Sequence, residues 1–276
     1  NARIVHIDID PTTLRKNVRV EVPVVSDALS ALQGLRSILE SGHAQKDWAG
    51  DHADWMGQVL EWQKEHPLSW AKGDVLKPQQ VVERMYEITK GEAIITTEVG
   101  QNQMWAAQYF KFKEPRTFLT SGGLGTMGYG LGAAIGAKMG CPDKTVVNIA
   151  GDGCFRMNMN ELATLSRHNI PVIEVVVNNH VLGMVRQWQT LFYGKRYSNT
   201  VLQDQADFVK VAEALGVKGI RVTKKEEMGP AIRAAIESGK PALIDVWIDC
   251  DEKVFPMVPA GAPIDQAFDS DDLKKQ

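Results

Sequence analysis

The sequence predicts an α/β fold in which a parallel sheet is covered by helices on both faces. From residue 78 onward, short apolar runs of strand length alternate with amphipathic segments of helix length. Such alternation is typical of strand–helix–strand units. The runs are apolar throughout, as expected when helices bury both faces of the sheet. Two of these runs end in polar residues, where parallel sheets usually bind their ligands.

The regular part of the chain begins at Pro78, a residue that favours the first turn of a helix. We expect strands at 93–97, 117–120, 145–150, 172–177, 219–222 and 242–248. We expect helices at 78–90, 102–109, 158–168, 181–191, 204–215 and 225–238, and a small-residue helix that ends at Gly140. This domain would span residues 78–254. The tail 255–276 contains proline and glycine and ends in polar residues, so we expect a mobile lid or a disordered end.

The first 42 residues predict two short strands, at 4–9 and 20–25, and a helix that begins at Ser26 or Asp27. Two strands and a helix cannot enclose a core. We therefore expect residues 1–42 to be the C-terminal remnant of a Rossmann-like domain, and the chain to be a piece of a longer protein. Asp8 and Asp27 lie near strand ends, where a carboxylate can bind a ribose hydroxyl. A turn residue and a helix N-cap are the alternative interpretations.

Residues 43–77 are expected to form a tryptophan-rich helix and a linker. Trp48, Trp55 and Trp62 recur every seven residues. Seven residues is close to two helical turns, so the three side chains would share one face. We expect this face to pack in a core or between domains.

Composition excludes several classes of protein. The net charge is −3 and no basic block is present, which argues against binding to nucleic acid. The three cysteines are odd in number and widely spaced, so they fit neither a disulfide framework nor a zinc site and favour a cytoplasmic protein. No apolar run is long enough for a transmembrane helix, so we expect no membrane partner.

The chemistry is concentrated in residues 146–184. One apolar run ends in Gly151-Asp152-Gly153, and the next ends in Asn178-Asn179. Right-handed crossovers bring consecutive parallel strand ends side by side. Asp152 and Asn179 would then offer a carboxylate and an amide oxygen to one Mg²⁺, which prefers hard oxygen ligands together with phosphate oxygens and water.

Two further groups would complete this site. The carbonyl of Val181 could supply a third ligand, and the N–H groups of Gly153 and Cys154, exposed by a tight turn, could face a diphosphate. A glycine turn and an unrelated Asn-Asn turn are the alternative interpretation.

A glycine-rich loop lies at residues 121–128. Gly123, Gly125 and Gly128 match the dinucleotide pattern G-x-G-x-x-G, but no acidic residue follows at the expected place. The glycines more simply let the backbone approach a flat ring, with Met127 as a polarizable apolar contact. A Rossmann dehydrogenase is the remote alternative.

Together these motifs resemble the thiamine diphosphate enzymes, whose cofactor motif is GDG followed, here after 24 residues, by NN. More specifically, the chain is similar to the catalytic large subunits of the acetohydroxyacid synthase (acetolactate synthase) family. The similarity covers the whole chain, and its most specific segments are 7–11, 98–108 (EVGQNQMWAAQ), 120–135, 183–189 (GMVRQWQ), 191–193, 196–198 and 257–262.

The resemblance implies the thiamine diphosphate-binding fold and an enzyme that uses thiamine diphosphate and Mg²⁺. The reaction would condense pyruvate with a second 2-ketoacid to 2-acetolactate or 2-aceto-2-hydroxybutyrate, in branched-chain amino acid biosynthesis. FAD would be a further cofactor of the full-length protein. The implied partners are a second copy, in a homodimer or tetramer, and a regulatory small subunit.

The resemblance also implies roles for single residues. Asp152, Asn179 and the Val181 carbonyl would bind Mg²⁺. Gly125 and Met127 would hold the cofactor bent for catalysis, and Trp188 would select the second 2-ketoacid, unless it is a core tryptophan. The implied cofactor contacts are Val99, Gly100, Gln101, Asn102, Gly125, Met127, Gly151, Gly153, Cys154, Asn179, Gly183 and Met184, with Asp8 and Asp27 at FAD.

The sequence departs from the family in four respects. Asn102 stands where the family often has histidine, which puts proton transfer there in doubt. Cys154 replaces a common serine, and Gly132 replaces a common proline. The family's catalytic glutamate belongs to an N-terminal domain of the opposing subunit, which no part of these 276 residues resembles. We therefore expect the chain alone to bind cofactor poorly and not to turn over.

Two other readings stay open. The chain could belong to another thiamine diphosphate enzyme, a pyruvate oxidase or a 2-ketoacid decarboxylase, against which Trp188 with Gln187 and Gln189 argues. It could also be a non-catalytic cofactor-domain fragment.

Overall fold

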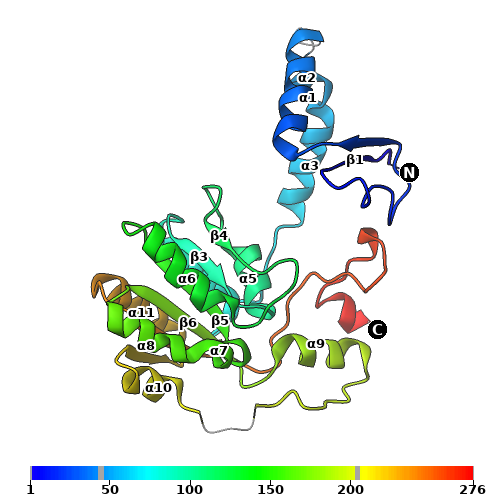
Figure 1. Ribbon diagram of the computed structural model, residues 1–276. Coiled ribbons are helices and arrows are strands. Elements are labelled where there is room, and N and C mark those ends of the chain that lie inside the picture. The colour runs from blue at the N-terminus through cyan, green and yellow to red at the C-terminus, as the bar shows by residue number, and fades with distance from the viewer. Residues whose placement is uncertain (1, 43–46, 203–205, 276) are drawn as a thin grey trace. The chain divides into compact units, whose positions relative to one another are not determined.

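The computed structural model describes residues 2–42, 47–202 and 206–275. The chain divides into two compact units, residues 1–68 and residues 69–276. Figure 1 shows the elements of both units. No helix within the described residues is both long and apolar enough to cross a bilayer.

A six-stranded, wholly parallel sheet forms the centre of the second unit. Its strand order is β4-β3-β5-β6-β8-β7. The strands are β3 (Ile94–Thr97), β4 (Phe118–Leu119), β5 (Val146–Gly151), β6 (Val172–Asn178), β7 (Lys218–Val222) and β8 (Ala242–Trp247). The predicted α/β fold is confirmed, and each expected strand is present.

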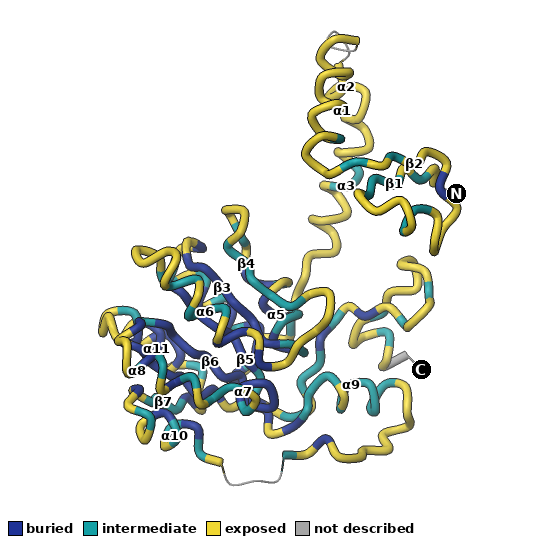
Figure 2. Tube along the Cα trace, viewed as in Figure 1, coloured by how far each residue is buried: buried dark blue, intermediate teal, exposed yellow. Residues whose placement is uncertain are grey.

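Helices cover both faces of this sheet. One face packs against α4 (Pro78–Thr89), α5 (Gln101–Tyr109) and α11 (Lys225–Glu237). The other packs against α6 (Tyr129–Gly140), α7 (Asp152–Asn158), α8 (Leu162–His168) and α10 (Phe208–Ala214). Successive strand residues alternate between the two cores, and Figure 2 shows the strands as the most buried part of the unit.

The direction of winding changes at β3. The chain passes from β3 to β4 on one side and then returns to place β5 on the other side of β3. Such a change opens a crevice beyond the carboxyl ends of the strands, and ligands bind there in sheets of this kind. The carboxyl ends of β3, β5 and β6 are neighbours at this point.

Two helices differ from the expected ranges. A helix, α7, begins directly at Asp152, where a tight turn and then a helix from residue 158 were expected; a 3₁₀ turn (Met159–Glu161) separates α7 from α8. An acidic residue in the first helical turn is favoured by the helix dipole. The glycines on both sides of Asp152 suggested a turn instead, so the start of the helix was missed. Asp207 caps α10 through the N–H groups of Val209 and Lys210, whereas the expected start at residue 204 lies outside the described residues.

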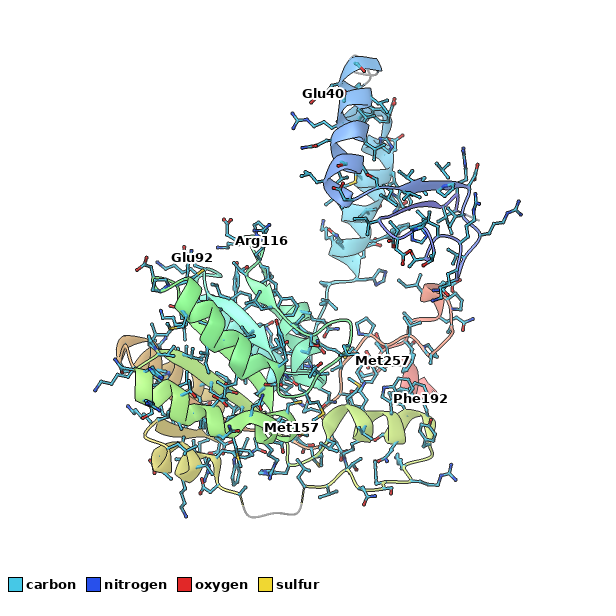
Figure 3. The ribbon with its side chains drawn as sticks, in the orientation of Figure 1. Glu40, Glu92, Arg116, Met157, Phe192 and Met257 are labelled. Carbon is cyan, nitrogen blue, oxygen red and sulfur yellow. The ribbon has the colours of Figure 1, made fainter. Side chains whose placement is uncertain are left out.

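The C-terminal segment is held near α9 (Gly183–Phe192). Met257 and Phe268 exchange backbone hydrogen bonds in both directions, at 2.9 and 2.8 Å. The ring of Phe268 lies 6.4 Å from that of Phe192, edge to face, and Figure 3 labels Phe192 and Met257 in this region. Opening of this segment as a lid stays a prediction.

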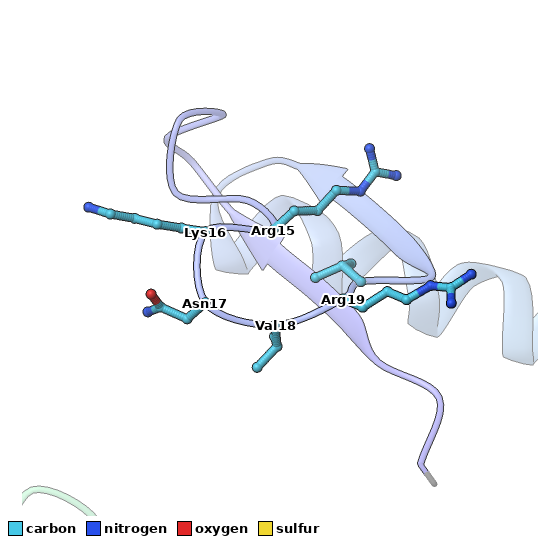
Figure 4. Close-up of a pocket in the computed structure, with 6 residues that line it drawn as sticks. Arg15, Lys16, Asn17, Val18 and Arg19 are labelled. Atoms are coloured by element: carbon cyan, nitrogen blue, oxygen red, sulfur yellow. The ribbon is translucent and has the colours of Figure 1, made fainter.

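The first unit contains two parallel strands, β1 (Val5–Asp8) and β2 (Val22–Val25), and the helices α1 (Ala28–Gly42), α2 (Trp48–Asp51) and α3 (Ala53–Glu65). The loop between the strands borders an open cavity of about 530 Å³, and the side chains of Arg15, Lys16 and Arg19 extend outward from it (Figure 4).

The tryptophan-rich segment forms two helices where one was expected, and its residues 43–46 lie outside the described part. His52 separates α2 from α3, with φ −112° and ψ 4°. Trp55 and Trp62 share a face as expected, because their rings meet edge to face at 5.6 Å. The expected burial is absent within the described chain, since Trp48, Trp55 and Trp62 are 44%, 59% and 46% exposed.

Candidate cofactor and metal site

A cavity of about 110 Å³ lies beyond the carboxyl ends of β3, β5 and β6. It brings together most of the residues that the sequence predicted for the site. The predicted residues that line it are Val99, Gly100, Gln101, Asn102, Met127, Gly151, Asp152, Gly153, Cys154, Asn179, Val181, Gly183 and Met184. Sequence reasoning missed four apolar lining residues, Trp105, Val177, Leu182 and Val185, because nothing in their local pattern distinguishes them from core residues.

Four predicted residues lie elsewhere. Gly125 adjoins the cavity, since a Cβ there would lie 3.8 Å from Cγ1 of Val99. Trp188 lines a neighbouring open cavity of about 630 Å³, which shares Met184 with the first one. Asp8 and Asp27 belong to the first unit, where Asp8 accepts from the N–H of Asp10 at 2.8 Å and Asp27 caps α1 through the N–H of Ser30 at 2.9 Å.

Asp152 is the first residue of α7 and is 1% exposed. Its Oδ2 atom is buried and has no hydrogen-bond partner. Burial raises the pKa of this carboxyl to about 7, against the opposing effects of the Gly153 N–H and the Arg156 charge. A buried carboxylate oxygen without a partner is costly unless a cation or proton meets it, so this atom fits a metal ligand.

Asn179 follows β6 and is 5% exposed. Its Oδ1 accepts from the N–H of Val181 at 3.2 Å, and its Nδ2 donates to Oε1 of Gln101 at 3.3 Å. His180 has φ 59°, a left-handed conformation that turns the chain sharply between Asn179 and Val181. The turn is thus locally fixed around the amide of Asn179.

A buried network of polar and charged side chains holds the turn at residues 179–181 in place. Asn178 accepts from the N–H of His180 at 3.2 Å and donates to Asp245 at 2.9 Å. Asp245 is 1% exposed and also accepts from Arg221 at 3.3 Å and from Nε1 of Trp247 at 3.0 Å. The position of the turn therefore depends on a satisfied, buried carboxylate.

The glycine-rich loop is anchored by Glu98, a residue that sequence reasoning did not assign. Its carboxylate accepts from the N–H groups of Gly128 at 2.6 Å, Gly130 at 2.8 Å and Leu131 at 3.3 Å. Burial raises the pKa of Glu98, although these N–H groups oppose the shift. Met127, next to the anchored Gly128, lines the cavity.

A polar row crosses the sheet behind this loop. Thr96, Asn148 and Glu174 occupy paired positions on β3, β5 and β6. Thr96 donates to Asn148, whose Nδ2 lies 3.0 and 2.9 Å from the two carboxyl oxygens of Glu174. Burial raises the pKa of Glu174 well above its ordinary value of 4.5, and nearby Glu98 adds to the shift.

Cys154 and Asn102 have side chains that are tied to the scaffold. The thiol of Cys154 donates to the carbonyl of Val99 at 2.9 Å, and burial raises its pKa to about 12, so the group is not a thiolate nucleophile. Nδ2 of Asn102 donates to the carbonyl of Ile149 at 2.8 Å. The first bond joins α7 to the segment after β3, and the second joins α5 to β5, both at the cavity.

Comparison with known proteins identifies the family. Residues 98–246 match the model of the C-terminal, thiamine pyrophosphate-binding domain of thiamine pyrophosphate enzymes. The chain is 41% identical over 274 residues to the acetolactate synthase isozyme 3 large subunit of Escherichia coli (97% of this chain, 47% of the relative). It is 45% identical over 268 residues to acetolactate synthase 1 of Nicotiana tabacum (94% and 40%).

A third relative is the acetolactate synthase large subunit of Corynebacterium glutamicum, 47% identical over 269 residues (95% and 42%). The chain thus spans less than half the length of each of these relatives. The family model covers more than half of the chain and includes Asp152 and Asn179. The chain therefore belongs to the thiamine pyrophosphate enzymes, as a bearer of their cofactor-binding domain.

Proposed function

We propose that this chain forms the thiamine diphosphate and Mg²⁺ side of an acetolactate synthase active site. The whole enzyme would condense pyruvate with a second 2-ketoacid to 2-acetolactate or 2-aceto-2-hydroxybutyrate. The observation that carries this proposal is the unpartnered Oδ2 of Asp152, which lies in the same glycine-walled cavity as Asn179. The identity of 41% and 47% to two acetolactate synthase large subunits supports the choice of reaction.

The residues at the cavity fit the cofactor by their chemistry. Asp152, Asn179 and the carbonyl of Val181 would hold Mg²⁺, a set of hard oxygen donors. Gly153 leaves open a space that a side chain would fill, since a Cβ there would lie 2.6 Å from Leu182, and its N–H in the first turn of α7 suits a diphosphate. When bound, thiamine diphosphate supplies the carbanion-stabilising chemistry, and the protein supplies orientation.

The cavity encloses only part of such a cofactor. Pockets for small molecules usually enclose roughly 300–1,000 Å³, whereas this one measures about 110 Å³. It would hold the diphosphate and its cation, with Gly125 and Met127 supporting the ring beside it. We propose that a second copy of the enzyme covers the ring and supplies the glutamate that starts the chemistry, in a homodimer or tetramer that also binds a regulatory small subunit.

Trp188 would contact the second 2-ketoacid. Its side chain is partly exposed on α9, lines the neighbouring cavity with Met184 and Tyr193, and lies 5.1 Å from the ring of Phe192. A tryptophan that served only the core would be buried, so its exposure favours the substrate role. FAD would contact Asp8 and Asp27 in the full-length protein.

Calorimetry with thiamine diphosphate and Mg²⁺ tests the site. We expect weak but saturable, Mg²⁺-dependent binding by the wild type and its loss in Asp152→Ala. Asp143→Ala, at an exposed position far from the cavity lining, is the matched control and should bind as the wild type does. Equal binding by Asp152→Ala and the wild type would overturn the site.

Product analysis tests the reaction. The chain alone should not turn over pyruvate, and activity should appear when the segment that carries the family's glutamate is added as part of a full-length enzyme. Acetolactate as product supports the proposal. Acetaldehyde or acetyl phosphate would instead indicate a decarboxylase or an oxidase.

A further inference from the structure

We propose that Gln187 and Gln101 are positioning residues that turn the amide of Asn179 so that its oxygen faces the cation. This inference rests on the proposed role of Asn179 as a metal ligand. An asparagine amide can present either its oxygen or its NH₂ group, and only the oxygen binds a cation. Two sets of contacts fix which end is presented. The N–H of Val181 donates to Oδ1 of Asn179 at 3.2 Å, and a series of buried hydrogen bonds that begins at the backbone of Val254 holds Nδ2 on the other side.

This series of hydrogen bonds starts at a backbone peptide group, whose donor and acceptor cannot exchange places. The backbone N–H of Val254 donates to Oε1 of Gln187 at 2.9 Å, and the carbonyl of Val254 accepts from Nε2 of Gln187 at 3.0 Å. A peptide group has its donor and acceptor in fixed places. Gln187 is 2% exposed, so water cannot replace these contacts, and its amide has one orientation.

Gln101 transmits this orientation. Its Nε2 donates to Oε1 of Gln187 at 2.8 Å and to the carbonyl of Glu252 at 2.8 Å. Both amide hydrogens are then used, and the side chain is 4% exposed. Reversal of Gln101 would place its oxygen against two acceptors, so Oε1 must face Asn179.

Asn179 meets this oxygen with Nδ2, the only donor of its side chain. Its Nδ2 lies 3.3 Å from Oε1 of Gln101, and its Oδ1 is left on the opposite side of the amide. Gly183 makes the fit close, because a Cβ there would lie 2.6 Å from Nδ2 of Asn179 and would also meet Gln101. Gly183 is the first residue of α9, and it lies close against the contact between Asn179 and Gln101. Gln187, which orients that contact, lies one turn further along the same helix.

Titration of Mg²⁺ in the presence of saturating thiamine diphosphate tests the proposal by calorimetry. Partners that orient metal ligands typically change metal affinity about 10- to 100-fold when they are removed. We expect a loss of this size in Gln187→Met and in Gln101→Met, which keep the volume of the side chain. Gln189→Met is the matched control on the same helix, because Gln189 donates to the carbonyl of Ser198 and lies outside the chain of amides; it should bind Mg²⁺ as the wild type does.

Asn179→Asp separates orientation from packing. A carboxylate has two equivalent oxygens and needs no turning, so Gln187→Met should cost little Mg²⁺ affinity in the Asn179→Asp background. An equal loss in both backgrounds would mean that Gln187 only packs, and the proposal would fail. Cooperative thermal unfolding of each variant shows that it is folded; if Gln187→Met is not, the same cycle with Gln101→Met decides.

The outcomes separate this inference from the proposed function. If Mg²⁺ binds equally to the wild type and to Asp152→Ala, the metal site itself is wrong. If binding depends on Asp152 but Gln187→Met and Gln101→Met bind Mg²⁺ as tightly as the wild type, the metal site stands and the amide chain is wrong.

Discussion

The carboxylate of Glu98 holds the N–H of Gly130 at 2.8 Å, and this contact presses α6 onto the end of β3. A Cβ on Gly130 would lie 2.8 Å from the backbone nitrogen of Glu98 and 2.8 Å from the carbonyl carbon of Thr97. Backbone atoms cannot move away as the end of a side chain can. The glycine is thus required for the contact that anchors the glycine-rich loop.

We therefore expect Gly130→Ala to lower the free energy of unfolding by about 1–3 kcal/mol, the usual cost of overpacking. Gly132→Ala is the control on the same helix, because no atom lies within 4 Å of its Cβ position. That change should stabilise the protein by up to about 1 kcal/mol, since alanine favours helix. Urea unfolding measures both, and a Gly130→Ala protein as stable as the wild type would contradict the geometry.

Glu174 should make stability depend on pH. Its pKa is raised in the folded protein, so the folded state keeps a proton that the unfolded state releases above the ordinary value of 4.5. The contribution to stability is complete below that value and is lost as the pH rises through the folded pKa. Glu174→Gln, which cannot ionise, should flatten the fall in unfolding free energy above pH 4.5. Urea titrations at several pH values measure the slope, and an unchanged slope in the variant would assign it to other groups.

Binding of Mg²⁺ should release a proton at Asp152. Without a cation, burial raises the pKa of Asp152 to about 7. Below that pH the cation must displace the proton, so we expect Mg²⁺ affinity to fall about tenfold for each unit of pH. Calorimetry in buffers with different ionisation enthalpies counts the protons released. Asp152→Asn should bind weakly at every pH, and a wild-type affinity that is constant below pH 7 would disprove the coupling.

Arg221 should contribute to stability through its ion pairs with Asp207, at 2.6 Å, and with the buried Asp245, at 3.3 Å. Removal of the guanidinium in Arg221→Met leaves the buried carboxylate without its cation, which should cost about 1.5–3 kcal/mol, the range for hydrogen bonds to charged groups. The side chain of Arg221 is 32% exposed, which keeps the loss below that of a fully buried pair. Lys210→Met is the control, because Lys210 is 81% exposed and lies 3.9 Å from Asp207. Thermal unfolding compares them, and equal stabilities would show that Asp245 does not need the cation.

The sequence predicted the sheet, and it predicted that the proposed metal ligands would lie together, because both depend on local signals. Continuous apolar runs such as residues 172–177 occur in strands that are buried on both faces. Asp152 and Asn179 could be placed together because parallel strands align their carboxyl ends. Their convergence on one cavity follows from the strand order alone.

The remaining features depend on contacts that no local pattern contains. The amide chain joins Gln101 to Gln187 over 86 positions, and Glu98 reaches Gly128 over 30. Glu174 is a charged residue type inside an apolar strand, and its environment comes from Asn148 on the neighbouring strand. The tryptophans at 48, 55 and 62 are exposed in this chain, and their packing between domains stays a prediction, since a hydrophobic period predicts a shared face but not what covers it.

The two hydrogen bonds between Gln187 and the backbone of Val254 also affect the order in which the protein folds. They join residues 67 positions apart, across α10, β7, α11 and β8. Contacts between distant residues form late, because closing a long loop costs entropy before the contact forms. We therefore expect the sheet around Asp152 to assemble first and the contacts of Gln187 with Val254 to form last. A folding intermediate without β8 would have Asp152 in place at the end of β5, and Asn179 would be held by the N–H of Val181 without the support of Gln187.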